Sequence, residues 1–319
     1  MSDKTVMPKE KKKKYHAKWT RDDTELTFLA LPTTIWYILF SFLPMFGIII
    51  AFKKFRINGG FIKSIFTSEW AGFDNFKFLF STGDIWIIIR NTLGYNIIFI
   101  ILGIVLPLTT ALMVSQLRNK RLAKVYQTAM FMPYFLSWIV ISAIVWAFLS
   151  YDKGLANGIL SSVGGQMHQW YMEKEFWPGF LIFMQVWKTL GYSMVVYLAT
   201  ITGVDRTYYE AAVMDGASIW QQMKSITLPI MKPVIIMMFI LSVGRIFYSD
   251  FGLFYNVPRD SNSLYNVVYT IDVFVFKQLK TSTPGMASAA AFIQSVAGCV
   301  TILTANWIVK KIDPESAMI

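Results

Sequence analysis

The sequence predicts an all-α integral membrane protein with six transmembrane helices and both termini in the cytoplasm. Of its 319 residues, 55% are hydrophobic, which exceeds the roughly 45 to 50 per cent usual in soluble globular domains. Several apolar segments are long enough to cross about 30 Å of hydrocarbon as helices. The net charge of +11 gathers in the polar segments between them, as is typical of the flanks of membrane spans.

Six apolar segments are predicted to span the membrane. They cover residues 26–52, 91–116, 126–150, 176–202, 233–254 and 286–309. The first contains no charged residue, and the last is rich in Ala, Ser and Gly, whose small side chains suit close helix packing in lipid. We therefore expect one six-span domain over residues 26–311.

The positive charges predict the orientation of the spans. Residues 1–25 carry eight Lys and Arg residues and are expected to be a disordered cytoplasmic tail, held inside by its charge; adhesion to membrane lipid is the alternative role. Of the 30 Lys and Arg residues, 17 fall in segments assigned to the cytoplasm and 11 in segments assigned to the outside. The external segments are 53–90, 151–175 and 256–284, the first with an interfacial helix, and residues 312–319 form a short cytoplasmic tail.

A polar loop over residues 205–232 separates the fourth and fifth spans. Asp205 is expected to be the N-cap of a first short helix, and Gly216 favours the left-handed turn that ends it. Ser218 and Gln221 form a capping box that starts a second short helix, which is expected to end at the prolines that follow.

This loop combines a Glu-Ala-Ala triplet, an Asp-Gly-Ala turn and an Ile-x-Leu-Pro sequence with a later Pro. The residues concerned are Glu210, Ala211, Ala212, Asp215, Gly216, Ala217, Ile226, Leu228, Pro229 and Pro233. Their register resembles the EAA loop of binding-protein-dependent ABC importer permeases. The resemblance implies that the loop, with Tyr208, is a cytoplasmic coupling element that docks into a cleft on an ATPase subunit. A plain amphipathic connector is the structural alternative.

The resemblance covers the chain from about Leu26 onward. Within the family, the chain is similar to permeases of the carbohydrate type, close to those for oligosaccharides or polysaccharide fragments. It implies a multi-pass subunit of the cell membrane that takes up sugar by alternating access. The implied partners are a second homologous permease in a heterodimer, two ATPase subunits, an extracellular solute-binding protein and membrane lipid. ATP and Mg²⁺ are expected on the ATPase subunits, and no cofactor on this chain.

Other functions find little support in the sequence. No Gly-rich phosphate loop of the Walker type is present, so the chain is not expected to be its own ATPase or another enzyme. With one Cys and two distant His residues, neither an intramolecular disulfide nor a His-based metal site or catalytic triad is expected. No basic and aromatic residues are interleaved as in a nucleic-acid-binding module.

Polar residues near or within the spans are the candidates for a substrate path. They are Asn96, Gln185, Trp187, Lys188, Tyr192, Arg245, Tyr248, Asp250 and Gln294. Lys188 and Arg245 each cost at least about 2.5 kcal/mol at a helix centre in lipid, so they should face protein or water, and Asp250 is placed to pair with Arg245. Amides and aromatic faces suit polyhydroxylated ligands, whereas pairing between helices is the structural alternative for each residue.

Two further interpretations remain open. An ion-coupled secondary transporter would need acidic residues inside the membrane, and only Asp250, at the edge of a span, qualifies. An ABC permease for a solute other than sugar is equally compatible with the loop. Outside the membrane, Trp170 and Tyr171 are expected either to meet the binding protein or to anchor the interface.

Overall fold

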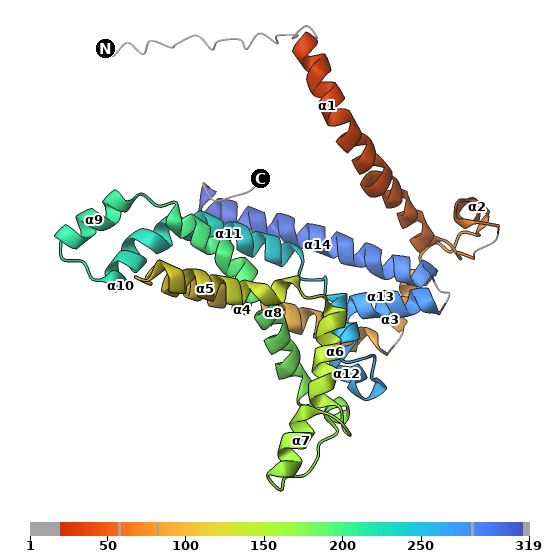
Figure 1. The fold of residues 1–319 in the computed structure, drawn as a ribbon. Helices are drawn as coiled ribbons and strands as arrows, with labels where there is room; N and C mark the ends of the chain where they lie inside the picture. Colours follow the sequence, from red (N-terminus) through yellow and green to blue (C-terminus); the bar gives the residue numbers. More distant parts are fainter. Residues whose placement is uncertain (1–19, 57–58, 82, 282–283, 315–319) are drawn as a thin grey trace, which may run out of the picture. The chain divides into compact units, whose positions relative to one another are not determined.

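The computed structural model describes residues 20–56, 59–81, 83–281 and 284–314 (Figure 1). The described chain is helical, and its one β-type pairing is an isolated antiparallel bridge between Lys53 and Trp70. The helices are α1 Arg21–Tyr37, α2 Phe61–Thr67, α3 Asp74–Ser81, α4 Ile85–Ser115, α5 Lys120–Phe131, α6 Trp138–Leu149, α7 Leu155–Ser162, α8 Trp177–Thr202, α9 Arg206–Met214, α10 Ile219–Gln222, α11 Leu228–Gly244, α12 Tyr265–Val268, α13 Ile271–Lys280 and α14 Pro284–Ile312.

Short 3₁₀ and π segments extend or connect these helices. The 3₁₀ segments are η2 Leu43–Phe52, η3 Met132–Phe135, η4 Trp170–Met172 and η7 Asn262–Leu264; the π segments are η1 Ile38–Phe42, η5 Met223–Thr227 and η6 Gly252–Asn256. The chain divides into two compact units, Met1–Gly47 and Ile48–Ile319.

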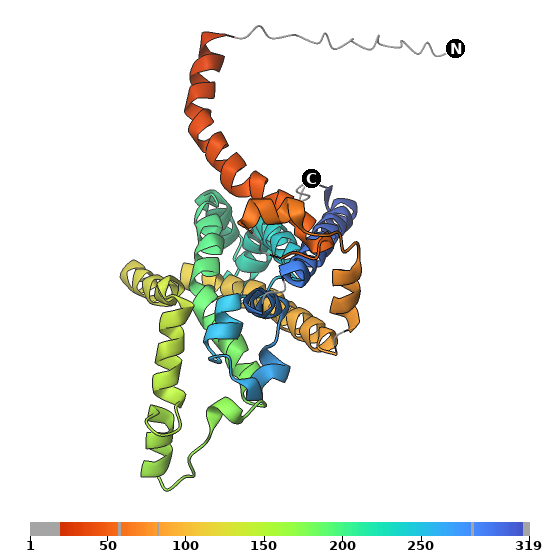
Figure 2. The ribbon, with the colours of Figure 1, turned by 90° about the vertical axis from the view of Figure 1, so that its right-hand side faces the viewer.

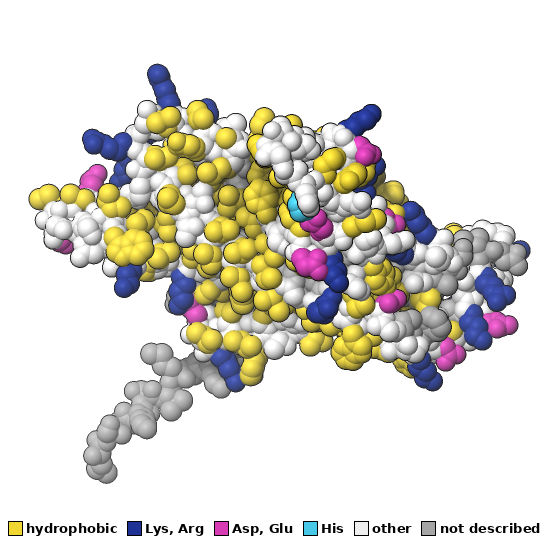
Figure 3. Space-filling view, turned by 90° about the horizontal axis from the view of Figure 1, so that it is seen from below, with side chains coloured by type: hydrophobic (Ala, Val, Ile, Leu, Met, Phe, Trp, Pro, Cys, Tyr) yellow, Lys and Arg dark blue, Asp and Glu magenta, His cyan; other side chains and the backbone are white. Residues whose placement is uncertain are grey.

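Five helical runs are long and apolar enough to cross a membrane, and the bent pair α5 and α6 raises the total to six if it counts as one span. An all-α membrane fold is therefore confirmed, with five or six candidate spans in the described residues. Hydrophobic side chains cover much of the face drawn in Figure 3, and many large ones on the long helices are exposed, as lipid-facing residues are.

The first helical run begins earlier than expected. Thr20 caps α1 and exchanges bonds with Asp23 in a capping box, so the helix starts at Arg21 instead of residue 26. A polar side chain that satisfies free backbone N–H groups can start a helix ahead of its apolar portion. Nearly all of the predicted basic tail lies outside the described residues.

The third predicted span, residues 126–150, is wrong as a single helix. The axis turns by 98° between α5 with its extension η3 and α6. Pro133 lies in the 3₁₀ turn, Leu136 has an extended backbone, and Ser137 then caps α6 by accepting a hydrogen bond from Val140 N at 3.3 Å. These local features stop one helix and start another, although the apolar pattern runs through both.

The fifth predicted span, residues 233–254, is wrong at both ends. One helical run extends from Ile219 through η5 and α11 to Gly244. The second short helix therefore does not end at the prolines: Pro229 follows the π segment η5, where the N–H of Leu228 donates to the carbonyl of Met223, and Pro233 lies inside α11. After Gly244 the chain leaves the helix, so the run does not reach residue 254.

The remaining spans agree more closely with expectation. The second begins at Ile85, six residues ahead of the predicted start, while α8 and α14 match residues 176–202 and 286–309 to within three residues at each end. The predicted external segment 256–284 contains α12 and α13, whose Val273 and Phe274 are buried, so this segment packs on the helices as part of the fold.

Two hydrophobic clusters hold Ile48–Ile319 together. α4 packs along α8, and α11 packs along α14 (Figures 1 and 2). One cluster joins the starts of α4 and α8 to α6 and α13, with Trp177 and Phe254 fully buried. The other joins the ends of α4 and α8 to α11 around Met194 and Met231. As expected from its small residues, α14 approaches α11 closely, since a Cβ on Gly298 would lie 3.0 Å from the carbonyl oxygen of Gly244.

Candidate functional site: an exposed helical loop and a polar cavity

The first short helix of the 205–232 loop is α9, and its start follows the predicted cap. The Asp205 carboxylate accepts a hydrogen bond from Thr207 N at 3.0 Å. This bond is stronger with the ionised carboxylate than with the neutral acid, and it holds the pKa of Asp205 below its usual value. The cap therefore stays charged and formed at neutral pH.

Gly216 ends α9 in a Schellman motif. Its φ is +77°, in the left-handed region that glycine adopts without strain. The N–H of Ala217 donates to the carbonyl of Ala212 at 2.8 Å, and the N–H of Gly216 donates to that of Val213 at 3.0 Å. The predicted glycine turn is confirmed, and these two bonds fix the angle between the short helices.

The second short helix, α10, begins with the predicted capping box. The Ser218 hydroxyl accepts from Gln221 N at 3.4 Å, and the Gln221 side chain accepts from Ser218 N at 2.7 Å. One contact was not expected from the sequence: the Tyr209 hydroxyl lies 2.9 Å from that of Thr227, which ties α9 to the start of α11. No spacing rule predicts this pair, because it depends on how the loop folds back.

We call α9, α10 and the turn between them the coupling segment (residues 205–222). It lies beyond the ends of α8 and α11 in Figure 1. Its apolar side chains are unusually exposed: Met214 is 86% exposed, Trp220 71% and Tyr208 59%. Glu210 is exposed as well. An exposed apolar patch with aromatic residues is typical of a protein-binding surface.

The other residues of the loop motif divide between exposed and partly buried positions. Ala211, Asp215 and Gly216 are exposed, and Ala212 and Ala217 are partly buried against the rest of the loop. Ile226 in η5 and Leu228 in α11 are partly buried, whereas Pro229 is exposed. The motif residues thus lie on α9, on the turn that follows it, and on η5 with the first turns of α11.

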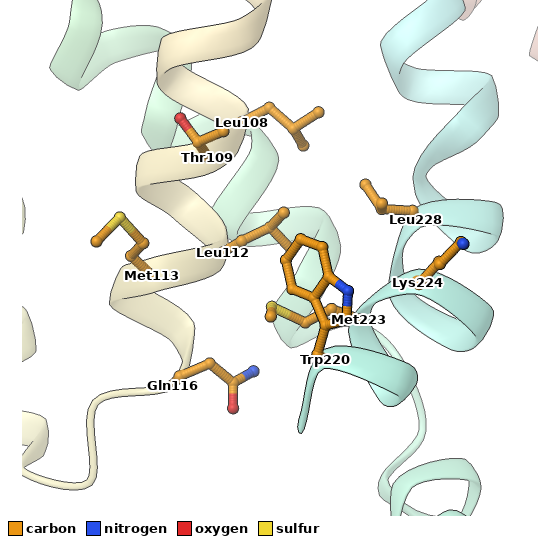
Figure 4. A pocket seen from close by; sticks show the side chains of 9 residues that line it. All are labelled: Leu108, Thr109, Leu112, Met113, Gln116, Trp220, Met223, Lys224 and Leu228. Atoms are coloured by element: carbon orange, nitrogen blue, oxygen red, sulfur yellow. The ribbon is translucent and has the colours of Figure 1, made fainter. Parts of the chain in front are cut away.

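A cavity of about 750 Å³ lies between α4 and the helical run formed by α10, η5 and the start of α11 (Figure 4). Leu108 and Leu112 of α4 face Trp220 and Met223 across it, as the close-up shows. The lining is almost entirely apolar, with Lys224 and Gln116 at its edge. Trp220 thus contributes both to this cavity and to the exposed surface of the coupling segment, a role that the sequence motif did not indicate.

A second cavity, of about 530 Å³, is polar and lies between α4, α8 and the end of α11. It brings together five of the predicted path residues: Asn96, Gln185, Arg245, Tyr248 and Asp250. The remaining lining residues are Phe99, Ile100, Ser242, Ser249 and Phe251. We call this space the polar cavity. Its volume lies within the about 300 to 1,000 Å³ usual for small-molecule sites.

The expected pair between Arg245 and Asp250 is not formed. Asp250 accepts a hydrogen bond from Trp138 Nε1 at 2.7 Å through one oxygen. Its other oxygen accepts from the backbone N–H groups of Gly252 and Leu253 at 3.0 and 3.3 Å. Three donors therefore satisfy this carboxylate, and it caps the turn η6 instead of binding the arginine.

Two further path residues have structural partners. Asn96 donates from Nδ2 to the carbonyls of Ile246 and Tyr248, both at 2.9 Å, and so attaches α4 to the chain after α11. Gln294 is buried and donates to the carbonyl of Phe247 at 2.9 Å. Asn96 also lines the polar cavity, whereas Gln294 does not.

Lys188, Trp187 and Tyr192 lie outside the residues that line the polar cavity. Lys188 donates to the carbonyls of Tyr134 and Leu136 at the bend between α5 and α6. The Tyr192 ring stacks on that of Tyr134 with centroids 4.6 Å apart. These two residues thus support the bend, which is the structural alternative that the sequence left open.

The aromatic pair outside the spans belongs to the packed core. Trp170 donates from Nε1 to Asn157 Oδ1 at 3.2 Å, and its carbonyl accepts from Trp177 Nε1 at 2.8 Å. Burial raises the pKa of Tyr171 to about 12, and its ring lies 5.1 Å from that of Trp177. Both side chains are partly buried and hold this segment on the helices, which a docking or anchoring role does not require.

The fold and the site are those of a membrane transport component. The long helices are apolar, the coupling segment is exposed, and the polar cavity lies between the helices. The family model of the binding-protein-dependent transport system inner membrane component matches residues 100–314. The chain belongs to this family. It is a multi-pass inner-membrane permease subunit of an ABC transporter and not itself an enzyme. The family implies no cofactor bound to this subunit.

Individual relatives agree with this assignment over most of the chain. The chain is 31% identical to the polygalacturonan/rhamnogalacturonan transport system permease protein YteP of Bacillus subtilis, covering 98% of this chain and 96% of the relative. It is 31% identical to protein LplB of the same bacterium, covering 92% and 91%. Among solved structures, a bacterial ABC transporter that imports the acidic polysaccharide alginate aligns with a TM-score of 0.81 at 29% identity, covering 92% of this chain and 97% of that chain.

Proposed function

We propose that this permease carries oligosaccharides across the membrane. The observation that supports this most directly is the polar cavity, where amide, hydroxyl and aromatic side chains such as Gln185, Tyr248 and Phe251 surround one space. Hydroxyl-rich ligands need hydrogen-bonding partners, and their sugar rings pack on flat apolar faces. The names of the relatives, which include a lactose permease of Rhizobium radiobacter, support a carbohydrate as the transported class.

The partners are proposed on the same basis. A second homologous permease completes the path as a heterodimer, and two ATPase subunits carry ATP and Mg²⁺. An external solute-binding protein delivers the sugar; the solved alginate transporter, in complex with a pentasaccharide-bound periplasmic protein, supports this by similarity. The exposed apolar surface of the coupling segment suits the docking of an ATPase subunit, because an unpartnered Met214 and Trp220 in water are unfavourable.

The continuity of one helical run supports a mechanism of alternating access. The run from Ile219 to Gly244 begins in the coupling segment and ends beside Arg245, which lines the polar cavity. A rotation imposed on α10 by closing ATPase subunits therefore reaches the cavity along a single helix. The apolar cavity between α10 and α4 leaves space for such a movement (Figure 4).

The proposed orientation places the 205–232 loop, residues 1–25 and residues 312–319 in the cytoplasm. A cysteine at Met214, in a background with Cys299→Ala and in cells that lack the ATPase subunits, should react with an impermeant maleimide only after the membrane is permeabilised. A cysteine at Ser162, on α7, should react from outside in intact cells. Reaction of the Met214→Cys variant from outside would contradict the orientation.

The transport function is tested by uptake into proteoliposomes that contain both permeases and the ATPase subunits, with the binding protein outside. We expect accumulation of oligosaccharide that requires ATP inside and stops when the catalytic residues of the ATPase are replaced. Uptake driven by an ion gradient without ATP would instead support the secondary transporter and overturn the proposal.

A further inference from the structure

The Arg245 side chain has no partner in the fold. Its guanidinium group lines the polar cavity and, among the residues that the structure describes, forms no hydrogen bond or ion pair. Arginine is always charged near neutral pH and carries five N–H donors. Arg245 is exposed and lines the polar cavity, so its guanidinium group is accessible to an acceptor that enters the cavity.

The single acidic residue of the cavity lining does not fill that role. Asp250 already accepts from Trp138 and from two backbone N–H groups, and its negative charge also interacts with the Lys188 ammonium. The lining therefore carries one positive and one negative side chain, and of these two only Arg245 has no partner within the described residues. Charge complementarity therefore favours an anionic ligand at the arginine.

The remaining lining residues restrict the kind of anion. Phe99 and Phe251 add apolar surface to the lining. The hydroxyls of Ser242 and Ser249 donate within the fold, to Met238 O and to Asp272, and can still accept from a ligand. The Oε1 atom of Gln185 is buried without a hydrogen-bond partner in the described structure, so the fold leaves one amide acceptor beside the cavity unsatisfied. A ligand that satisfies this set combines hydroxyl groups, a ring with an apolar face and a planar anionic group.

We propose that the transported oligosaccharide bears carboxylates, as uronic acids do, and that Arg245 selects it by pairing with one of them. A guanidinium binds a carboxylate through two parallel N–H···O bonds, which gives both energy and orientation. This inference rests on the proposed carbohydrate transport and narrows its substrate class. It makes Arg245 a specificity-determining residue, while the hydroxyl-binding groups serve acidic and neutral sugars alike.

The test compares trigalacturonate with its fully methyl-esterified form, because the two differ in charge but share the sugar chain. Equilibrium binding is measured on the assembled complex of permeases and ATPase subunits without the binding protein, which removes selection by that protein. Uptake of both sugars into proteoliposomes with the binding protein present is measured in parallel. The variants are Arg245→Gln, which removes the charge, and Arg245→Lys, which keeps it without the planar fork.

We expect the unaltered complex to bind trigalacturonate roughly tenfold to a hundredfold more tightly than the ester, the range for a hydrogen bond to a charged group. Arg245→Gln should remove this preference, and Arg245→Lys should keep part of it. The matched control is Lys63→Gln on α2, an exposed cation away from the cavity, which should keep the full preference.

Three results would overturn the inference. The first is equal binding of acid and ester by the unaltered complex, and the second is an unchanged preference for the acid in Arg245→Gln. The third is an equal loss of affinity for both sugars in Arg245→Gln, which would assign Arg245 to packing or to a pair with the second permease. Each of these leaves carbohydrate transport intact as long as the unaltered transporter takes up either sugar. ATP-independent uptake, or uptake of neither of these sugars nor of neutral trisaccharides, would instead count against the proposed function itself.

Discussion

Lys188 in α8 donates a hydrogen bond to the backbone carbonyl of Leu136 at 2.6 Å. The same ammonium group donates to the carbonyl of Tyr134 at 2.8 Å and lies near the rings of Tyr134 and Trp138. These carbonyls are free because the chain bends between α5 and α6, where no helical N–H reaches them. A residue that looked like part of a substrate path thus completes the hydrogen bonding of a broken helix.

Replacing Lys188 with Met should therefore destabilise the permease, although it removes a charge from a membrane span. Hydrogen bonds from a charged group contribute about 1.5 to 3 kcal/mol, and the two lost here include one to the partly buried carbonyl of Leu136. Thermal unfolding of the purified complex in detergent should show a clear fall in Tm for Lys188→Met and a smaller fall for Lys188→Gln, which can still donate. Lys153→Met, in an exposed turn, is the control. An unchanged Tm for Lys188→Met would show that the bend does not need this residue.

Gly191, one turn after Lys188, allows α8 to approach the same bend. A Cβ at this position would overlap the backbone of Met130 and Phe131 in α5. Gly191→Ala should therefore push the helices apart at a cost of roughly 1 to 3 kcal/mol, as overpacking in a core does. Gly179→Ala in the same helix has open space around its Cβ and should be neutral. Equal unfolding temperatures for the two variants would contradict the close packing.

Gly216 should be sensitive to substitution for its backbone conformation alone. A Cβ at this residue meets nothing within 4 Å, but its φ of +77° is strained for residues other than glycine by roughly 1 to 2 kcal/mol. Gly216→Leu should insert normally and lose transport through failed docking or uncoupled ATP hydrolysis, whereas Gly216→Asn should retain most of it. Glu210→Ala should have a milder effect, because it leaves the path of the chain unchanged.

Uptake, ATPase rate and recovery of the assembled complex are the measurements for the Gly216 variants. Gly203→Ala is the matched control, since Gly203 also follows a helix but has a negative φ of −80°. Normal sugar uptake by Gly216→Leu would show that the coupling segment does not transmit ATP hydrolysis.

Trp220 should matter for assembly more than for folding. Because its side chain is 71% exposed, Trp220→Ala leaves the fold largely intact but removes apolar surface from the coupling segment. A central aromatic residue of an interface contributes about 2 kcal/mol or more to binding, so the affinity for the ATPase subunit should fall at least tenfold. Trp86→Ala, equally exposed at the start of α4, should leave this affinity unchanged. Titration of the ATPase subunit onto permease in nanodiscs measures both.

Much of the coupling segment could be predicted from the sequence because its determinants are local. The Asp205 cap, the left-handed Gly216 and the capping box of Ser218 and Gln221 each depend on residues within a few positions of one another. Hydrogen bonds between near neighbours in the chain form in almost any tertiary context. The apolar composition likewise determined the all-helical membrane fold, since a spanning helix satisfies its own backbone.

Tertiary structure decided the features that depend on distant parts of the chain. Asp250 caps η6 and binds Trp138, 112 residues away, so it does not pair with Arg245 as spacing alone suggested. The bend at residues 132–137 starts from local features, Pro133 and the Ser137 cap, but Lys188 from another helix supplies the donors that complete it. Hydropathy reports which residues leave water, whereas the partner of each buried polar group depends on how the helices pack.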